Sequence, residues 1–183
     1  MTHSWTAQRS RGRQGLALVV LALMVGMAAV LGIRVMRSWP HIPTMGVMLH
    51  PFGVPVRYQN CGFHTGQDWF APTGAPIYAI ADGVVAYVGP LWLDGPDVGR
   101  GPYAIILDHG TYRSTYSHNR AALVQAGEQV RRGQRIAELG DEGFAGGPHL
   151  HLEVVASEWT GDWQRPFAGC DGYRDPGRRW SPF

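Results

Sequence analysis

A chain of 183 residues has room for one domain of ordinary size and a short appendage. All 16 basic residues are arginine, and residues 38–183 hold 11 of them together with all 14 acidic residues, a formal charge of −3. A nucleic-acid-binding domain needs a concentrated basic surface, so the composition argues against nucleic acid as a partner.

The N-terminal segment predicts a membrane anchor. Residues 15–33 are uncharged and mostly apolar, and as a helix they would rise about 28 Å, close to the thickness of a bilayer's hydrocarbon core. Three arginines precede the run, which favours a cytoplasmic N-terminus and export of the rest of the chain. We expect a basic cytoplasmic stretch over 1–14, an uncleaved transmembrane signal anchor over 15–33 and a linker over 34–44, with a cleaved signal peptide as the alternative.

The chain has two cysteines, Cys61 and Cys170. Export places them in a compartment where disulfides form and persist, so the sequence predicts a bond between the two. This bond would tie the C-terminal tail to the region just before His64. Two free thiols are the alternative.

Beyond the linker, short apolar or alternating segments are separated by Gly, Pro and Asp turns, which is typical of antiparallel β structure. We therefore expect a mostly β, antiparallel domain over residues 45–160 and an irregular tail over 161–183. A weak helical pattern covers residues 119–125. The expected strands are residues 76–81, 83–88, 103–108, 113–117, 135–139 and 149–155.

The segment Gly146–Glu153 (GGPHLHLE) alternates histidine with leucine, which predicts a β-strand. His149 and His151 then share one face, about 6.6–7 Å apart at the backbone, while the leucines face a core. Two neighbouring imidazoles are consistent with a metal site and equally with two half-buried polar side chains. The strand alone does not decide between these interpretations.

Two other segments bring metal-ligand residue types to the same β framework. His64 and Asp68 are four residues apart, and His118 ends an alternating segment that contains Tyr116. Catalytic zinc takes three protein ligands from His, Asp, Glu or Cys and leaves a fourth position for water. His64, Asp68 and one of the two strand histidines meet this count, and two histidines remain for proton transfer. A structural zinc site with Cys61 as a ligand is the alternative.

The order and spacing of these motifs resemble the lysostaphin-type, LytM-like zinc metalloendopeptidases, which cut the peptide bridges of bacterial murein. The resemblance covers residues 45–156 and rests on His64-x-x-x-Asp68, Tyr116-Ser117-His118 and Gly147–Glu153. It implies that family's antiparallel fold, a duplicated hybrid motif, and zinc held by His64, Asp68 and His151.

The same resemblance implies that His118 and His149 are the catalytic histidines, which handle the proton of the zinc-bound water and steady the tetrahedral oxyanion. Tyr116 becomes a wall of the substrate site, with packing as the alternative account. The segment His50-Pro51-Phe52 also looks similar, but His50 receives no role.

The sequence therefore predicts a membrane-anchored zinc metalloendopeptidase that hydrolyses peptide cross-links of peptidoglycan with a metal-activated water. Its expected partners are peptidoglycan peptide stems or cross-bridges, and the membrane through the N-terminal helix. We expect a single-pass protein of the cell membrane whose catalytic domain lies on the periplasmic or extracellular side. The alternative function is a non-catalytic scaffold of the same fold that binds peptidoglycan or activates a separate cell-wall amidase.

Overall fold

The computed structural model describes residues 20, 22–24, 27, 42–57, 59, 61–90, 104–143, 145–156 and 170–178. The chain divides into two compact units, Met1–Trp39 and Pro40–Phe183. In the first unit the few described residues are helical, and most of the predicted anchor lies outside the described residues. None of the described helical segments is both long enough and apolar enough to cross a bilayer.

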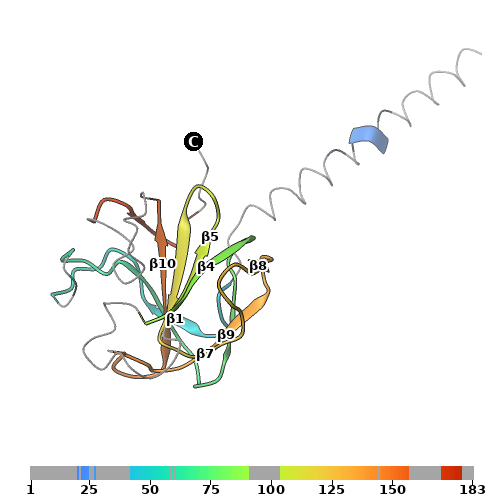
Figure 1. Cartoon of the computed structure of the whole chain (residues 1–183). Coiled ribbons are helices and arrows are strands. Elements are labelled where there is room, and N and C mark those ends of the chain that lie inside the picture. The colour runs from blue at the N-terminus through green and yellow to red at the C-terminus, as the bar shows by residue number, and fades with distance from the viewer. Residues whose placement is uncertain are drawn as a thin grey trace, which may run out of the picture. The chain divides into compact units, whose positions relative to one another are not determined.

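The described part of the second unit is built from two antiparallel sheets (Figure 1). The strands of the larger sheet are β1 (Val47–His50), β2 (Gly66–Phe70), β4 (Gly83–Gly89), β5 (Ala104–Asp108), β6 (Arg113–Ser117), β8 (Gln129–Val130), β10 (His149–Val155) and β11 (Tyr173–Arg174). Those of the smaller sheet are β3 (Pro76–Tyr78), β7 (Asn119–Ala122) and β9 (Arg135–Leu139). The larger sheet has the order β1-β2-β10-β6-β5-β4-β8 with β11 beside β10, and the smaller has the order β3-β9-β7.

These sheets confirm the predicted mostly β, antiparallel fold. Strands β6, β9 and β10 occupy the predicted residues, and β3, β4 and β5 overlap them. The helical interpretation of residues 119–125 is wrong, because β7 pairs with β9 in that region. The tail predicted as irregular over 161–183 contains β11, which pairs with the end of β10.

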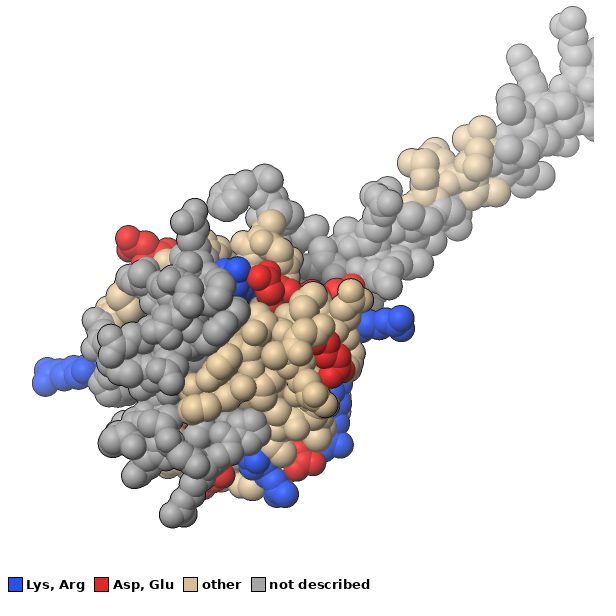
Figure 2. All heavy atoms as spheres, viewed as in Figure 1, with Lys and Arg blue, Asp and Glu red and all other residues tan. Residues whose placement is uncertain are grey.

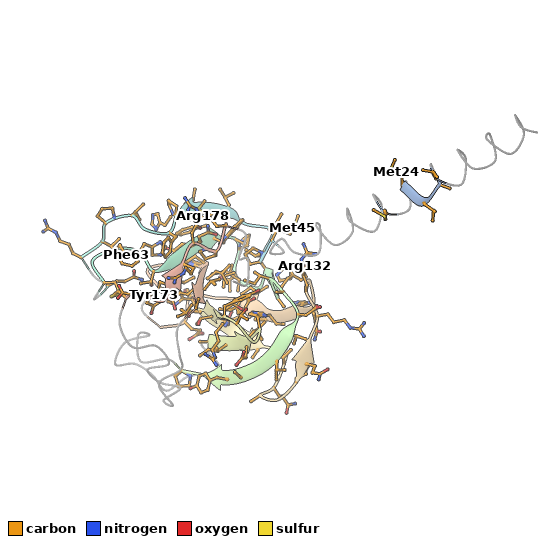
Figure 3. All side chains as sticks on the ribbon, turned by 90° about the horizontal axis from the view of Figure 1, so that it is seen from above. Met24, Met45, Phe63, Arg132, Tyr173 and Arg178 are labelled. Carbon is orange, nitrogen blue, oxygen red and sulfur yellow. A yellow bond between two sulfur atoms is a disulfide. The ribbon has the colours of Figure 1, made fainter. Side chains whose placement is uncertain are left out.

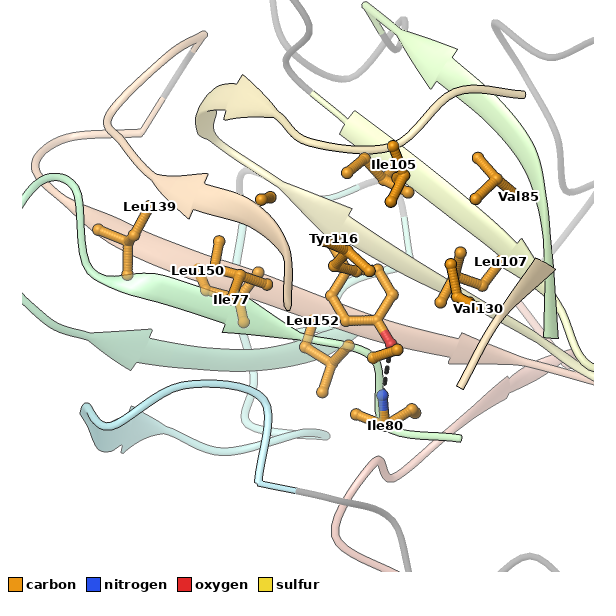
Figure 4. Close-up of a cluster of buried hydrophobic side chains, with 14 of the residues drawn as sticks. Ile77, Ile80, Val85, Ile105, Leu107, Tyr116, Val130, Leu139, Leu150 and Leu152 are labelled. Atoms are coloured by element: carbon orange, nitrogen blue, oxygen red, sulfur yellow. Dashed lines mark hydrogen bonds between the residues drawn. The ribbon is translucent and has the colours of Figure 1, made fainter. Parts of the chain in front are cut away.

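Apolar side chains of both sheets meet in one core between them (Figure 4). Ile77 of β3, Leu139 of β9 and Leu150 and Leu152 of β10 are at most 2% exposed. Burial of each such side chain contributes about 1.5–3 kcal/mol to folding. The leucines of the alternating segment thus anchor β10 to the core, and every second residue of that strand faces the other way.

Tyr116 belongs to this core and not to the wall of a substrate site. Its side chain has no exposed surface, and its hydroxyl accepts a hydrogen bond of 2.9 Å from the backbone nitrogen of Ile80 (Figure 4). The Ser114 hydroxyl lies 3.2 Å from the same oxygen. The structure therefore favours the alternative in which Tyr116 has a packing role, over the predicted contact with substrate.

A disulfide joins Cys61 to Cys170, as the sequence predicts. Phe63 and Tyr173, labelled in Figure 3, come from the two segments that this bond connects. Because β11 also pairs with β10, two links hold residues 170–174 against the sheet that carries the histidines.

Charges of both signs are interspersed on the described surface. In the view of Figure 2, arginine and acidic side chains surround an area of other residues. Arg120 pairs with Glu138 at 3.2 Å and Arg113 with Asp108 at 3.0 Å. A surface of mixed sign produces weaker long-range steering of charged ligands than a surface of one sign.

Candidate metal centre

The pairing of β2 with β10 sets the positions of the candidate site residues. The antiparallel register places Asp68 opposite His151 and Phe70 opposite His149. Because alternate residues of a strand share a face, His149, His151 and Glu153 all point away from the core. The strand predicted from the alternating segment therefore brings both imidazoles to β2, and the register brings one of them to Asp68.

A glycine lets β2 approach β10 closely at this point. A Cβ on Gly66 would lie 2.9 Å from Cε1 of His151, closer than real Cβ contacts. His64, two residues earlier, is 1% exposed and reaches the same side chains. A glycine at position 66 therefore allows β2 to lie close to β10. This close approach brings His64 and Asp68, on either side of Gly66, to the side chain of His151.

Three donor atoms converge between the two strands. Nε2 of His64 lies 3.1 Å from Oδ1 of Asp68, Nδ1 of His151 lies 2.7 Å from that oxygen, and the two nitrogens are 3.2 Å apart. Tetrahedral zinc with bonds of 2.0–2.1 Å separates its donors by about 3.4 Å. The three observed separations are shorter than this by about 0.2 to 0.7 Å, so binding would require the side chains to move apart by that amount. Together they form a group that could hold a metal.

Each of these side chains is held through the atom that faces away from the cluster. The Nδ1–H of His64 donates to the Pro51 carbonyl at 3.0 Å. Oδ2 of Asp68 lies 3.1 Å from Nδ1 of His50, and Nε2 of His151 lies 3.2 Å from Oε1 of Glu153. Outer contacts of this kind orient metal ligands and fix their tautomers.

The electrostatics of the cluster favour a cation at its centre. Burial raises the pKa of Asp68, but hydrogen bonds from His151 and His64 outweigh it and hold that pKa well below its usual range. Burial lowers the pKa of His151, but hydrogen bonds to Asp68 and Glu153 and their negative charges raise it to about 10. A divalent metal at this point would replace the Nδ1 proton, because a ligating nitrogen must be unprotonated.

Two further histidines lie beside the cluster with one nitrogen already occupied. The Nδ1–H of His149 donates to the Gly147 carbonyl at 2.8 Å, and the Nδ1–H of His118 donates to the Glu142 carbonyl at 2.7 Å. The centroids of the two rings are 4.6 Å apart, and Nε2 of His149 is 3.7 Å from Oδ1 of Asp68. Burial lowers the pKa of both, for His118 to about 4. In the neutral rings Nε2 therefore carries no proton and is able to accept one.

His118 has an unusual backbone conformation. Its φ of 65° lies in the left-handed region, which is sparsely populated by residues other than glycine and costs about 1–3 kcal/mol. The residue joins β6 of the larger sheet to β7 of the smaller one. The turn between sheets thus aims this imidazole at His149, and backbone strain of this kind is common at functional sites.

The structure brings together the five residues predicted as ligands and proton-handling histidines, and adds three that sequence reasoning missed. His50 contacts Asp68, although its side chain is 59% exposed, and Thr65 and Glu153 contact each other behind His151. Glu153 was detectable, since it follows His149 and His151 at the period of two that defines a strand face. No signal in the sequence pairs β1 with β2, so the contact between His50 and Asp68 could not be predicted.

The antiparallel β fold and the His–Asp–His donor set define a domain of the metallopeptidase class. The chain is 39% identical over 94 residues to the peptidoglycan DD-endopeptidase ShyC of Vibrio cholerae, covering 51% of this chain and 20% of that protein. It is 29% identical over 139 residues to lysostaphin of Staphylococcus simulans, covering 73% of this chain and 26% of that protein. The chain thus spans about a fifth to a quarter of the length of these relatives.

Solved structures with the same fold agree with this class. The catalytic domain of lysostaphin from Staphylococcus simulans superposes with a TM-score of 0.56 at 27% identity, over 72% of this chain and 89% of that domain. A zinc-containing peptidase from Vibrio cholerae superposes with a TM-score of 0.59 at 26% identity, over 80% of this chain and 41% of that one. Residues 62–164 match peptidase family M23, and the chain belongs to that family.

Proposed function

We propose that this chain is a zinc-dependent endopeptidase that hydrolyses peptide cross-links of bacterial peptidoglycan. The observation that supports the proposal most is the convergence of His64, Asp68 and His151 on one point, with donor atoms 2.7–3.2 Å apart. These three residues would hold the ion. When bound, zinc lowers the pKa of a water molecule and polarises the carbonyl of the scissile bond.

His149 and His118 are the proposed proton carriers. Each donates its Nδ1–H to a backbone carbonyl, so each presents an unprotonated Nε2 on the cluster side of the sheet. A proton accepted at Nε2 of one ring makes that ring a cation, which then steadies the developing oxyanion and gives the proton to the leaving amine. General acid–base catalysis of this kind contributes about 10²–10⁴-fold to a rate.

The donor set favours a catalytic metal over a structural one. A structural zinc site is closed by four protein ligands, and the rival site needed the Cys61 thiolate. That sulfur is in the bond with Cys170, so three protein ligands and one open position remain. The completeness of the set also favours hydrolysis over the non-catalytic scaffold, which has no need of the two proton-carrying histidines.

The proposed location is the cell membrane, with the peptidase domain on the periplasmic or extracellular side. The uncharged run over residues 15–33 and the arginines before it support this orientation. The disulfide also supports an exported domain, because such bonds persist in oxidising compartments. Peptide stems or cross-bridges of peptidoglycan, which occupy that side, are the proposed partners.

Digestion of cross-linked muropeptides, followed by mass spectrometry, tests the proposed activity. The zinc-loaded chain is expected to convert dimers into monomers, and His149→Ala is expected to bind zinc and leave the dimers uncut. Cleavage by His149→Ala at the parent rate would overturn the assigned role. Bound zinc without cleavage by the parent chain would favour the scaffold.

A further inference from the structure

A buried chain of three side chains runs away from the proposed metal position. Thr65 donates its hydroxyl hydrogen to Oε1 of Glu153 at 2.6 Å, and the same oxygen lies 3.2 Å from Nε2 of His151. Thr65 and Glu153 are 4% and 3% exposed. Hydrogen bonds in such a dry environment are stronger than at the surface, and losing one partner is costly.

This chain decides which nitrogen of His151 faces the cluster. A carboxylate oxygen is an acceptor only, so Nε2 of His151 must hold a proton when it bonds to Glu153. The nitrogen that remains, Nδ1, is the one 2.7 Å from Asp68. His149, two residues earlier on the same face, is fixed in the opposite way, because its Nδ1–H is the atom that donates to Gly147.

We infer that Glu153, held by Thr65, is a positioning residue that fixes the ring of His151 with Nδ1 directed at the metal. The inference rests on the proposed zinc site. It explains why His149 and His151 present different nitrogens to the cluster. The Glu153 carboxylate holds the Nε2–H of His151, whereas the Gly147 carbonyl holds the Nδ1–H of His149. Glu153 itself does not reach the group of donor atoms formed by His64, Asp68 and His151.

The variants Glu153→Gln and Thr65→Val separate this role from simple packing. Both retain nearly the same volume. Glu153→Gln replaces the charged acceptor by a neutral, weaker one, and Thr65→Val removes the hydroxyl donor. Thr65→Ser keeps the hydroxyl and serves as the matched control. Glu138→Gln is the second control, since that carboxylate pairs with Arg120 and Arg135 on the smaller sheet.

The first readout is zinc affinity of the full chain, measured by competition with a chromophoric chelator. Loss of an outer partner of a metal ligand typically weakens binding 10–100-fold. We expect that range for Glu153→Gln and a smaller weakening for Thr65→Val, with both controls at the parent value. Unchanged affinity in Glu153→Gln, with a normal far-ultraviolet dichroism spectrum, would overturn the inference.

The second readout is the imidazole N–H signal of His151 in chain labelled with ¹⁵N-histidine. The parent should show an Nε2–H proton that is shifted downfield and protected from exchange, with and without zinc. Glu153→Gln should move it upfield and speed its exchange, and an unmoved signal would contradict the inference. If the parent binds no zinc, the proposed function fails, whereas this signal still decides whether Glu153 positions the ring.

Discussion

Two histidine networks lie in the larger sheet, one around Asp68 and one around His109. Around His109 both ring nitrogens have protein partners, the Asp82 carbonyl at 2.7 Å and the Ser114 hydroxyl at 2.7 Å. That hydroxyl contacts Tyr116, whose oxygen is in turn bonded to the Ile80 nitrogen. Every polar group of this network is used within the protein.

The network around Asp68 is arranged differently. Its outer atoms are occupied by Pro51, His50 and Glu153, but the inner atoms of His64, Asp68 and His151 crowd one another. These inner atoms hydrogen-bond to one another, and a bound cation would replace the protons between them. The comparison therefore distinguishes His109, whose two nitrogens contact a carbonyl and a hydroxyl, from the proposed ligands His64 and His151, whose nitrogens converge on one carboxylate oxygen.

The largest expected effect is the loss of a converging donor. His64→Ala removes one of the three proposed ligands, so we expect loss of stoichiometric zinc and of muropeptide cleavage. The two-sheet core is separate from this side chain, so the dichroism spectrum should match the parent. Elemental analysis after gel filtration measures the zinc. Full zinc retention in this variant would contradict the assigned donor set.

The next effect is a loss of rate without loss of metal. His118→Asn removes the imidazole, while asparagine tolerates the left-handed backbone that His118 adopts with φ of 65°. We expect kcat to fall about 10²–10⁴-fold, the usual contribution of a general acid or base, with zinc content unchanged. A kcat within twofold of the parent would show that His118 only shapes the turn.

A smaller effect is expected in the other network. Tyr116→Phe leaves the buried nitrogen of Ile80 without its acceptor, which costs about 1–3 kcal/mol of unfolding free energy. Because Tyr116 lies in the core, the activity of the folded protein should not change. Urea titration and muropeptide digestion measure the two quantities. Lost activity with unchanged stability would restore Tyr116 to the wall of the substrate site.

The smallest effect concerns pH and His109. Burial lowers the pKa of this ring, so between that value and about 6.5 the unfolded chain binds more protons than the folded one. Its contribution to stability is present above about pH 6.5 and is lost as pH falls towards the folded pKa. His109→Gln, which does not titrate, should lose less unfolding free energy between pH 7 and pH 5 than the parent. Equal losses would contradict the shift.

The sequence revealed those parts of the fold where side chains alternate cleanly. His149–Val155 was predicted with its observed bounds, because Leu150, Leu152 and Val154 enter the core at every second position. β2 was missed because Gly66, Gln67 and Asp68 carry no apolar alternation, although all three are buried. β7 was interpreted as a weak helix, since local preference does not include its pairing with β9.

The candidate site was predictable in composition but not in geometry. Spacing placed His149 and His151 on one face, but only the pairing of β10 with β2 puts His151 opposite Asp68. The contact of His50 with Asp68 depends on a register shift between Met48 and His50 in β1, and no local pattern encodes it. The positions of the site residues relative to one another therefore depend on long-range strand pairing, which the local motifs do not specify.

X-ray absorption at the zinc edge tests the central claim most directly, because it reports the atoms around the ion. For the zinc-loaded chain we expect nitrogen and oxygen neighbours at about 2.0–2.2 Å with imidazole scattering, and weaker imidazole scattering in His151→Ala. A sulfur neighbour at about 2.3 Å, or a spectrum that is unchanged in His151→Ala, would contradict the assignment of His64, Asp68 and His151 as the metal ligands.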